Sequence, residues 1–518
     1  MDDWKVNRKL TLNLGMRWEI IGGMFEVARR MSALSFTAAN ARAGGRPGAL
    51  VWIDDLGRKS FQDRYWRQLS PKFGFAYAIS PKLVMRGGYG INNTPPISNG
   101  WGFGGGEGFN SSIARNTGNV ALRFAEEPVG LLHDRYLDFA GVLPNKDPSM
   151  ANGRGANYWA PDSNRLAYVQ NWNLGFQYEL PQFFVLELNY IGNKGTRLEA
   201  QGLDSLNSLP ISFLDMGQKL TDPWNAASGI PQPFPGFAGT VLQALRPYPQ
   251  YTGIGQDFAN FGTSLYNGLQ VQVTRHFRNG LAILGAYTWS KAIGLASGAL
   301  GDYSVSAADV FNRRLERSIL SYNYPQFFKL TWIYELPIGP NKLVNIPGLA
   351  GKIIGGWNVT GNLQVRSGSP LSVWGGSINN PLGSARLDQV PGQKIILDSN
   401  APINFRGLRG GTAYLNREAF TLPPVHPGGR NVITRLGTLG PVLPNIRGPH
   451  WTSEDLAIDK TWSLGEARSF QIRGTFLNPF NRHGRGGLDT DILSPFFGQL
   501  TGQGSGPRNI ELSARITF

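Results

Sequence analysis

The feature that most constrains this chain is a period-two alternation of apolar and polar residues that recurs along its length. The last nine residues show it most clearly, because five apolar residues alternate with four polar ones: Ile510, Glu511, Leu512, Ser513, Ala514, Arg515, Ile516, Thr517 and Phe518. Successive side chains of a β-strand point to opposite faces, so the pattern indicates a strand with unlike faces. A soluble sandwich and a membrane barrel both contain such strands, and repetition of the pattern is what distinguishes them.

The same alternation recurs in eleven other segments, which predicts about twelve strands in total. Each predicted strand is about 9–13 residues long, the length that a tilted strand needs to cross a bilayer. The apolar positions of the twelve segments fall within residues 10–20, 73–79, 83–91, 172–180, 184–190, 269–273, 281–289, 328–336, 357–365, 456–462, 470–476 and 510–518.

The connections between these segments alternate between long and short. The short ones include Ser80-Pro81-Lys82 and Phe277-Arg278-Asn279-Gly280, whereas the long ones are rich in Gly, Asn and Pro. This predicts an all-β, antiparallel up-and-down transmembrane barrel with long extracellular loops and short periplasmic turns. Soluble sandwiches rarely have such long excursions on one side only. The predicted extracellular loops are residues 21–70, 92–166, 195–264, 293–323, 369–453 and 481–508.

The predicted apolar face has two basic residues and two groups of aromatic residues. Arg275 and Lys460 lie near the short-turn ends of their strands, where a long side chain can reach lipid headgroups at low cost. Aromatic side chains at both ends of the strands are expected at the two membrane interfaces. The group at the long-loop ends is Trp18, Tyr190 and Trp289, and the opposite group is Tyr178, Tyr334, Trp462 and Phe518.

Composition excludes several other classes of protein. The sequence has no window resembling a transmembrane helix of about 20 apolar residues. It has no cysteine, which excludes a disulfide framework and thiolate metal sites. The net charge of +15 could suggest nucleic-acid binding. However, the basic residues are scattered singly through strands and loops, so we expect no nucleic-acid partner.

The sequence contains no motif that supports catalysis, cofactor binding or a metal site. The histidines lack the spacing of a metal site, and the glycine-rich segment 102–108 lacks the strand–turn–helix context of a nucleotide loop. Asp489 and Asp491 are two carboxylates in a polar loop, which are usually solvated. We therefore expect no enzyme activity, and the substrate-binding residues stay unknown. The five histidines are His133, His276, His426, His450 and His483.

Polar residues on the inward face of the predicted strands form a wall. In any barrel these side chains can satisfy one another and water, so no single member is identified as a binding residue. Small residues such as Gly88 and Ala286 also occur on this face and suit a wide lumen. The polar members are Arg17, Glu19, Arg86, Glu187, Gln270, Gln272, Gln364, Arg366, Gln471, Arg473 and Arg515.

Several segments of the chain, in order, resemble the barrel of TonB-dependent outer-membrane receptors. The similarity is greatest to the large Oar-like subgroup, which carries an amino-terminal carboxypeptidase-regulatory-like domain. It covers essentially the whole chain and ends on the terminal phenylalanine. The segments that carry it are residues 2–6, 10–18, 70–77, 86–90, 190–196, 287–291, 355–357 and 473–481.

The resemblance implies parts that this sequence does not show. Such receptors have a signal peptide, a TonB box, a plug inside the pore and a barrel of about 22 strands. We therefore expect residues 1–518 to be the carboxy-terminal part of a receptor barrel in the outer membrane of a Gram-negative-type bacterium. Its expected partners are outer-membrane lipid, the missing plug, the TonB energy-coupling complex and an unknown solute.

Two functions are consistent with this interpretation. The first is energised uptake of a large or scarce solute, which the resemblance favours. The second is a surface or adhesion role, in which the barrel only displays its long loops and transports nothing. The length of loops 92–166 and 369–453 leaves this second role open.

Overall fold

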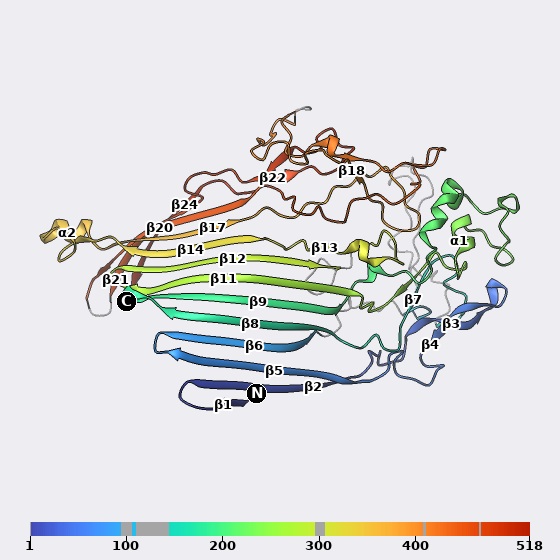
Figure 1. Ribbon diagram of the computed structural model, residues 1–518, viewed down its shortest axis with the longest axis horizontal. Coiled ribbons are helices and arrows are strands. Elements are labelled where there is room, and N and C mark those ends of the chain that lie inside the picture. The colour runs from blue at the N-terminus through green and yellow to red at the C-terminus, as the bar shows by residue number, and fades with distance from the viewer. Residues whose placement is uncertain (1, 95–105, 110–143, 296–305, 408–410, 466–467) are drawn as a thin grey trace, which may run out of the picture.

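One large antiparallel sheet dominates the computed structural model, which describes residues 2–94, 106–109, 144–295, 306–407, 411–465 and 468–518 (Figure 1). Each strand pairs with the next long strand in the sequence, as in an up-and-down meander. In sheet order the strands are β1 (Asp2–Lys5), β2 (Leu10–Ile21), β5 (Tyr65–Ser80), β6 (Leu83–Thr94), β8 (Ala167–Glu179), β9 (Phe184–Leu198), β11 (Gly262–Arg278), β12 (Leu281–Gly294), β14 (Gln326–Glu335), β17 (Trp357–Arg366), β20 (Trp451–Ser463), β21 (Ser469–Leu477) and β24 (Asn509–Thr517).

The predicted fold class is confirmed, and all twelve predicted segments are strands in the expected order. The count of about twelve is low, because the sheet has 14 strands. The two that were missed are β1 and β13 (Ser318–Ile319), which pairs with the end of β12. They have only four and two residues, too few to show an alternation. Within the described residues, β1 and β24 are the two ends of the sheet and do not pair with each other.

The long connections gather at one end of the sheet and the short turns at the other (Figure 1). The long connections are more ordered than the sequence predicts, since they contain short strands and helices. The predicted loops 92–166, 293–323 and 369–453 lie partly outside the described residues. The additional strands are β3 (Ser32–Asn40), β4 (Arg46–Trp52), β7 (Gly155–Tyr158), β10 (Gly253–Gln256), β18 (Asp388–Gln389), β19 (Phe420–Thr421), β22 (Arg485–Leu488) and β23 (Leu500–Gln503).

Helices are few and short. The connection between β14 and β17 holds β15 (Ile338–Gly339), β16 (Val344–Asn345) and the α-helix α2 (Gly348–Ile354). No helix in the described ranges is long and apolar enough to cross a membrane. The others are α1 (Val241–Leu245) and the 3-10 helices η1 (Ala41–Ala43), η2 (Pro181–Phe183), η3 (Gln201–Leu203), η4 (Ile211–Thr221), η5 (Ala226–Ser228), η6 (Arg313–Glu316) and η7 (Arg417–Ala419).

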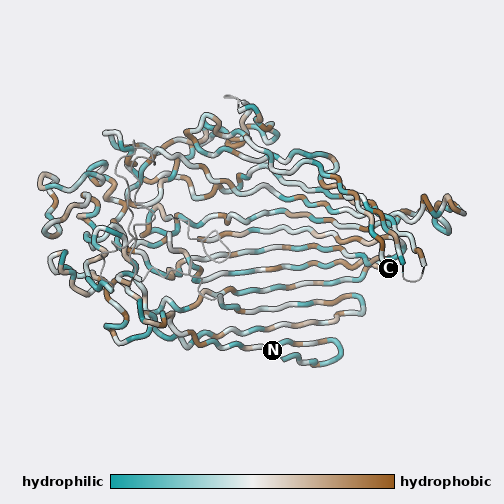
Figure 2. Tube along the Cα trace, turned by 180° about the vertical axis from the view of Figure 1, so that it is seen from behind, coloured by the Kyte–Doolittle hydropathy of each residue, from teal (hydrophilic) through white to brown (hydrophobic). Residues whose placement is uncertain are grey.

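The register of the ladder gives the sheet one apolar face and one polar face. Leu188 lies opposite Phe176 and Val271, whereas its neighbour Glu187 lies opposite Gln177 and Gln272. Apolar and polar residues therefore line up in rows across neighbouring strands, and the hydropathy alternates along each strand (Figure 2). A shift of one residue in any pairing would move a whole strand's apolar set to the wrong face.

Glycines on the apolar face accommodate aromatic rings from the neighbouring strand. Trp332 lies opposite Gly361, and Trp172 lies opposite Gly192. A Cβ atom at either glycine would overlap the indole of its partner. The ring therefore covers the backbone that a side chain would otherwise shield. This contact favours one register for each strand pair.

That Arg275 and Lys460 reach lipid headgroups stays a prediction, and the structure shows both side chains hydrogen-bonded to backbone carbonyls. The Arg275 guanidinium donates to the carbonyl oxygen of Leu281 at 2.9 Å. The Lys460 ammonium donates to carbonyl oxygens of the β14–β17 connection, and the residue is only 3% exposed. Both cations are therefore hydrogen-bonded to backbone carbonyl oxygens close to the short-turn ends of their strands.

Substitution by arginine should distinguish the two faces. Leu188→Arg or Val359→Arg, near mid-strand on the apolar face, should cost about 2–4 kcal/mol, because the charge would face hydrocarbon. The matched change Gln364→Arg on the polar face should cost much less. The measurement is the folded yield in bilayers, and equal tolerance of both faces would reject the assignment.

The aromatic–glycine pairs can be tested separately. Gly361→Ala should destabilise the β14–β17 pair by about 1–3 kcal/mol, because the new methyl group displaces the Trp332 ring. Gly285→Ala is the control, since a Cβ there would lie 3.7 Å from Leu330, an ordinary contact. For each variant, the measurement is the temperature at which the folded form is no longer seen on a gel. A Gly361→Ala protein as heat-resistant as the Gly285→Ala protein would contradict the pairing role.

Candidate functional site

The polar face carries cross-strand contacts between side chains that the sequence assigns to one wall. Glu187 lies between Gln177 of β8 and Gln272 of β11. Farther along the sheet, Asp459 accepts hydrogen bonds of 3.4 Å from Asn358 and from Gln471. Charged groups and amides therefore meet across neighbouring strands and give a surface that water or a polar solute can wet.

A second polar cluster lies where β2, β5 and β6 approach the long loops. The Asn93 amide donates to Glu19 and to Ser70, both at 2.7 Å, and accepts from Gln68 at 2.7 Å. Glu19 also forms an ion pair of 2.6 Å with Arg17. Two members of the predicted wall, Arg17 and Glu19, are thus brought together and satisfied within the protein.

The hydrophobic core lies in the long loops rather than in the sheet. One cluster joins the loop before β20 to the loop before β24, and a second joins the loops before β5, β8 and β11. We call the described residues of the long connections the loop layer. Because its contacts join residues far apart in sequence, it is a packed structure at one end of the sheet. Members of the first cluster include Leu387, Leu415, Phe420, Ile492 and Leu500, and members of the second include Leu34, Trp52, Ala156, Tyr251 and Ile254.

Ion pairs join separate segments of the loop layer, both between two loops and within one loop. Arg386 pairs with Glu316, whose side chain is fully buried. Arg435 pairs with Asp388 at 2.7 Å, and this hydrogen-bonded guanidinium lowers the pKa of the Asp388 carboxyl. Removing one partner of a buried pair leaves an unpaired charge, which costs about 3–5 kcal/mol. The loop layer is therefore held by specific contacts as well as by apolar packing.

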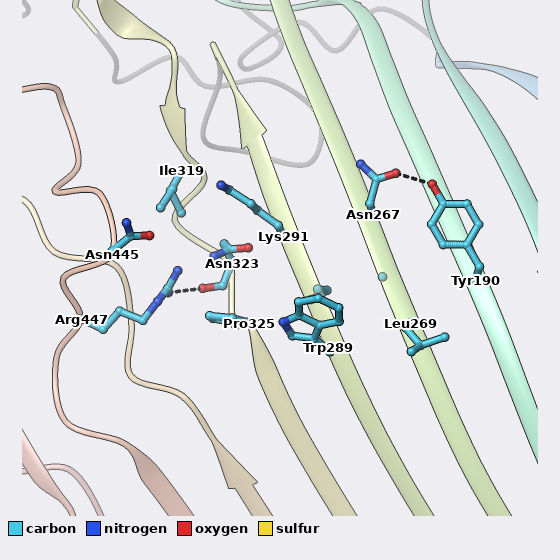
Figure 3. A pocket seen from close by; sticks show the side chains of 12 residues that line it. Tyr190, Asn267, Leu269, Trp289, Lys291, Ile319, Asn323, Pro325, Asn445 and Arg447 are labelled. Carbon is cyan, nitrogen blue, oxygen red and sulfur yellow. Dashed lines mark hydrogen bonds between the residues drawn. The ribbon is translucent and has the colours of Figure 1, made fainter.

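A cavity of about 500 Å³ lies where β9, β11 and β12 reach the loop layer. Its wall includes Tyr190, Asn267, Trp289 and Lys291 from the strands (Figure 3). These positions share a face with Leu269, so the cavity opens on the apolar face and not on the polar one. It therefore lies outside any route along the polar face.

Hydrogen bonds fix the cavity wall from both sides. The Tyr190 hydroxyl donates to Asn267 at 2.7 Å (Figure 3). The Arg447 guanidinium donates to the carbonyl oxygen of Asn323 at 2.7 Å, and Asn323 in turn accepts from the amide of Ala292. Such a wall can hold the polar end of an amphipathic molecule beside aromatic rings. Sequence reasoning missed Asn323 and Arg447, because loop residues carry no periodic signal.

The motifs that the sequence excluded as sites have structural roles where the chain is described. Asp489 and Asp491 accept from the backbone amides of Asp491 and Leu493 at 3.0 Å, so they cap turns. A ring nitrogen of His426 lies 2.9 Å from the Leu214 carbonyl oxygen. His133 and most of segment 102–108 lie outside the described residues. Within the described ranges, no three His, Asp or Glu side chains are grouped so that they could hold a metal ion.

Asp257 is a loop-layer carboxyl whose pKa is raised by burial. It follows β10, and its carboxylate accepts a hydrogen bond from the indole of Trp159. Trp159 is 3% exposed and packs edge-on against Phe258 at 5.2 Å. Burial raises the pKa of Asp257 to about 6, and the bond from Trp159 only partly offsets this. The charged form of Asp257 therefore destabilises the folded protein at neutral pH.

This loss of stability predicts that Asp257→Asn stabilises the folded protein in a pH-dependent way. The folded-state pKa lies above the unfolded one, so the stability that Asp257 contributes is present below about pH 4 and is lost as pH rises through about 6. Asparagine keeps the acceptor for Trp159 and removes the charge. At about pH 8 the variant should therefore show slower hydrogen exchange in segments 144–166 and 246–261 than the wild type, and at about pH 4 the difference should vanish. A difference independent of pH would contradict this explanation.

Comparison with known proteins supports a membrane assignment of the fold. A family model described as an outer membrane beta barrel domain matches residues 1–511. No curated protein sequence matches the chain. The chain is similar to solved structures at low identity, and it spans between 37% and 53% of the three chains named below.

Three of these structures illustrate the level of similarity. The ferripyoverdine receptor of the outer membrane of Pseudomonas aeruginosa, bound to ferripyoverdine, matches at 11% identity and TM-score 0.38, over 100% of this chain and 37% of that one. The siderophore receptor PirA from Acinetobacter baumannii matches at 9% identity and TM-score 0.42, over 100% of this chain and 44% of that one. The outer membrane transporter YddB from Escherichia coli matches at 9% identity and TM-score 0.41, over 100% of this chain and 53% of that one. Because the family model covers nearly the whole chain, this protein belongs to the family of outer-membrane β-barrel domains and is located in the outer membrane.

Proposed function

We propose that this chain is part of the barrel of a TonB-dependent receptor of the Oar-like subgroup, which takes up a large or scarce solute by energised transport. The observation that carries the proposal is the polar face of the sheet. It combines charged and amide groups with small residues, and this suits a wide lumen that holds another protein element. The small residues are Gly88, Gly90, Ala282, Ala286 and Ala457.

In this proposal, residues 1–518 form the carboxy-terminal part of the receptor barrel. The plug and the segment that contacts TonB belong to the rest of the receptor. The sequence resemblance supports this arrangement, and so do the two free edges of the sheet. An unpaired strand edge is unfavourable in lipid because its backbone groups lack partners, and further strands would satisfy them.

The loop layer lies where a solute outside the cell would first meet the receptor. Its packed cores and ion pairs hold the loops in defined positions, which a selective capture surface requires. Movement of the plug by TonB would then admit the solute to the polar face.

The proposal predicts that loss of this protein and loss of TonB have the same effect. A mutant lacking the receptor gene should fail to grow on one scarce solute from a panel of iron chelates, cobalamins, oligosaccharides and peptides. A mutant lacking TonB should fail on that solute too, and the double mutant should be no worse. Uptake that persists without TonB would overturn the proposal.

A matched pair of substitutions on β12 links uptake to the polar face. In the complete receptor, Ala286→Trp would project into the lumen and should reduce uptake at least several-fold. Tyr287→Trp is the control, because this neighbouring position faces lipid and the aromatic character is kept. Equal surface abundance of the two variants, checked by antibody on intact cells, separates transport from folding. Equal uptake by both variants would count against a lumen route.

A surface or adhesion role is the second candidate. The observation that favours it is the size and order of the loop layer, which contains most of the buried apolar residues in the described chain. In that case deletion of the gene should reduce attachment of cells to a surface, and removal of TonB should leave attachment unchanged. This outcome is opposite to the one expected for energised uptake.

A further inference from the structure

The connection between β14 and β17 differs from the other turns at its end of the sheet. It projects beyond the strand ends and contains α2 (Figure 1). Several of its apolar side chains are not covered by protein, with Leu343 89% exposed and Leu349 73% exposed, while Ile353 and Ile354 are each more than half exposed. We call residues 338–356 the α2 connection. Apolar residues gathered in this way on a surface indicate an interaction.

The α2 connection is ordered by specific contacts with its own backbone and with the end of β14. Gly339 and Gly355 approach each other so closely that a Cβ on Gly355 would lie 2.6 Å from the Gly339 Cα. Lys342 forms an ion pair of 2.9 Å with Glu335 at the end of β14. Gly356 has a φ of +73°, which turns the chain from α2 into β17 and favours glycine at this position. The exposed apolar side chains are therefore held in place by backbone contacts beneath them.

Lys460 fastens α2 to the apolar face of the sheet. Its ammonium donates to the carbonyl oxygens of Lys352 at 2.6 Å and Ile353 at 2.8 Å, and also to that of Gly355. These are the unpaired carbonyls at the carboxy-terminal end of α2, where a cation is stabilised. Lys460 lies opposite Trp357 in the register and on the same face as Trp462, with the two rings 5.8 and 4.9 Å from its ammonium.

The surface next to this attachment belongs to the apolar face of the sheet. A groove of about 540 Å³ begins at Trp357 and runs along Ile458, Ile472 and Leu512. The exposed side chains of α2 therefore lie next to an apolar surface of the sheet. Tryptophan and lysine at that junction are the residues expected at a membrane interface.

We infer that the α2 connection is a membrane anchor that lies in the periplasmic leaflet of the outer membrane, with Leu343, Leu349 and Ile353 among the lipid headgroups and upper acyl chains. Its partner is phospholipid. Lys352 is exposed beside the apolar residues and suits the phosphates of that leaflet. The inference goes beyond the proposed transport function and rests on the membrane location and on the short-turn end of the sheet facing the periplasm.

Single cysteines test the location directly, because the natural chain has none. Leu349→Cys and Ile353→Cys are each labelled with an environment-sensitive fluorophore in isolated outer membranes. Lys82→Cys is the control, since it lies in the exposed turn between β5 and β6 at the same end of the sheet. Phospholipids carrying a nitroxide near the headgroup are then added as quenchers.

The two α2 labels should show blue-shifted emission and at least twofold stronger quenching than the Lys82 label. Water-like emission at the α2 sites would overturn the inference. Shielded emission that the nitroxide lipids do not quench would also overturn it, because it would place a protein and not lipid on this surface.

A second variant tests the role of Lys460. Lys460→Met keeps an apolar stem and removes the ammonium that holds α2, so quenching of the Leu349 label should fall toward the value at Lys82. Unchanged quenching would show that α2 does not depend on Lys460 for its position and would overturn that part of the inference. If this variant does not fold, the labels in the otherwise natural chain still decide where the connection lies.

Discussion

The constraint on which this structure depends is that backbone N–H and C=O groups need partners where no water is present. In hydrocarbon an unpaired backbone group costs several kilocalories per mole, so a chain that crosses with strands must pair each one with its neighbours. Between its two edges, the ladder from β1 to β24 meets this requirement one antiparallel pair at a time. The period of two follows, since pairing in register leaves one face of the sheet for lipid and the other for polar groups.

The same constraint explains why the apolar core lies outside the sheet. Side chains on the apolar face are stable in contact with lipid, so they do not have to pack against another layer of protein. The long loops lie in water and must bury apolar residues to become ordered, as Leu415 and Tyr251 do. Ion pairs such as Arg386–Glu316 then fix which loops meet. Lipid is thus the apolar environment of the sheet, and buried side chains are the apolar environment within the loop layer.

Lysine 460 shows how a charge on the apolar face can be tolerated. Its ammonium is buried among carbonyl oxygens and two indole rings, and α2 supplies the carbonyls. The charge and the helix end therefore satisfy each other. Trp332 over Gly361 is an apolar counterpart, in which a ring occupies the space above a strand that lacks a side chain.

The sequence by itself determined the long strands, their order, the two faces and the side on which the loops lie, because alternation and loop length are local properties of the chain. Only the tertiary structure decided where β1, β13 and α2 lie. A four-residue strand such as Asp2–Lys5 is too short to show a period, and it exists because β2 offers it a ladder edge. The cavity beside Trp289 also required the structure, since Asn323 and Arg447 reach it through contacts between segments more than a hundred residues apart.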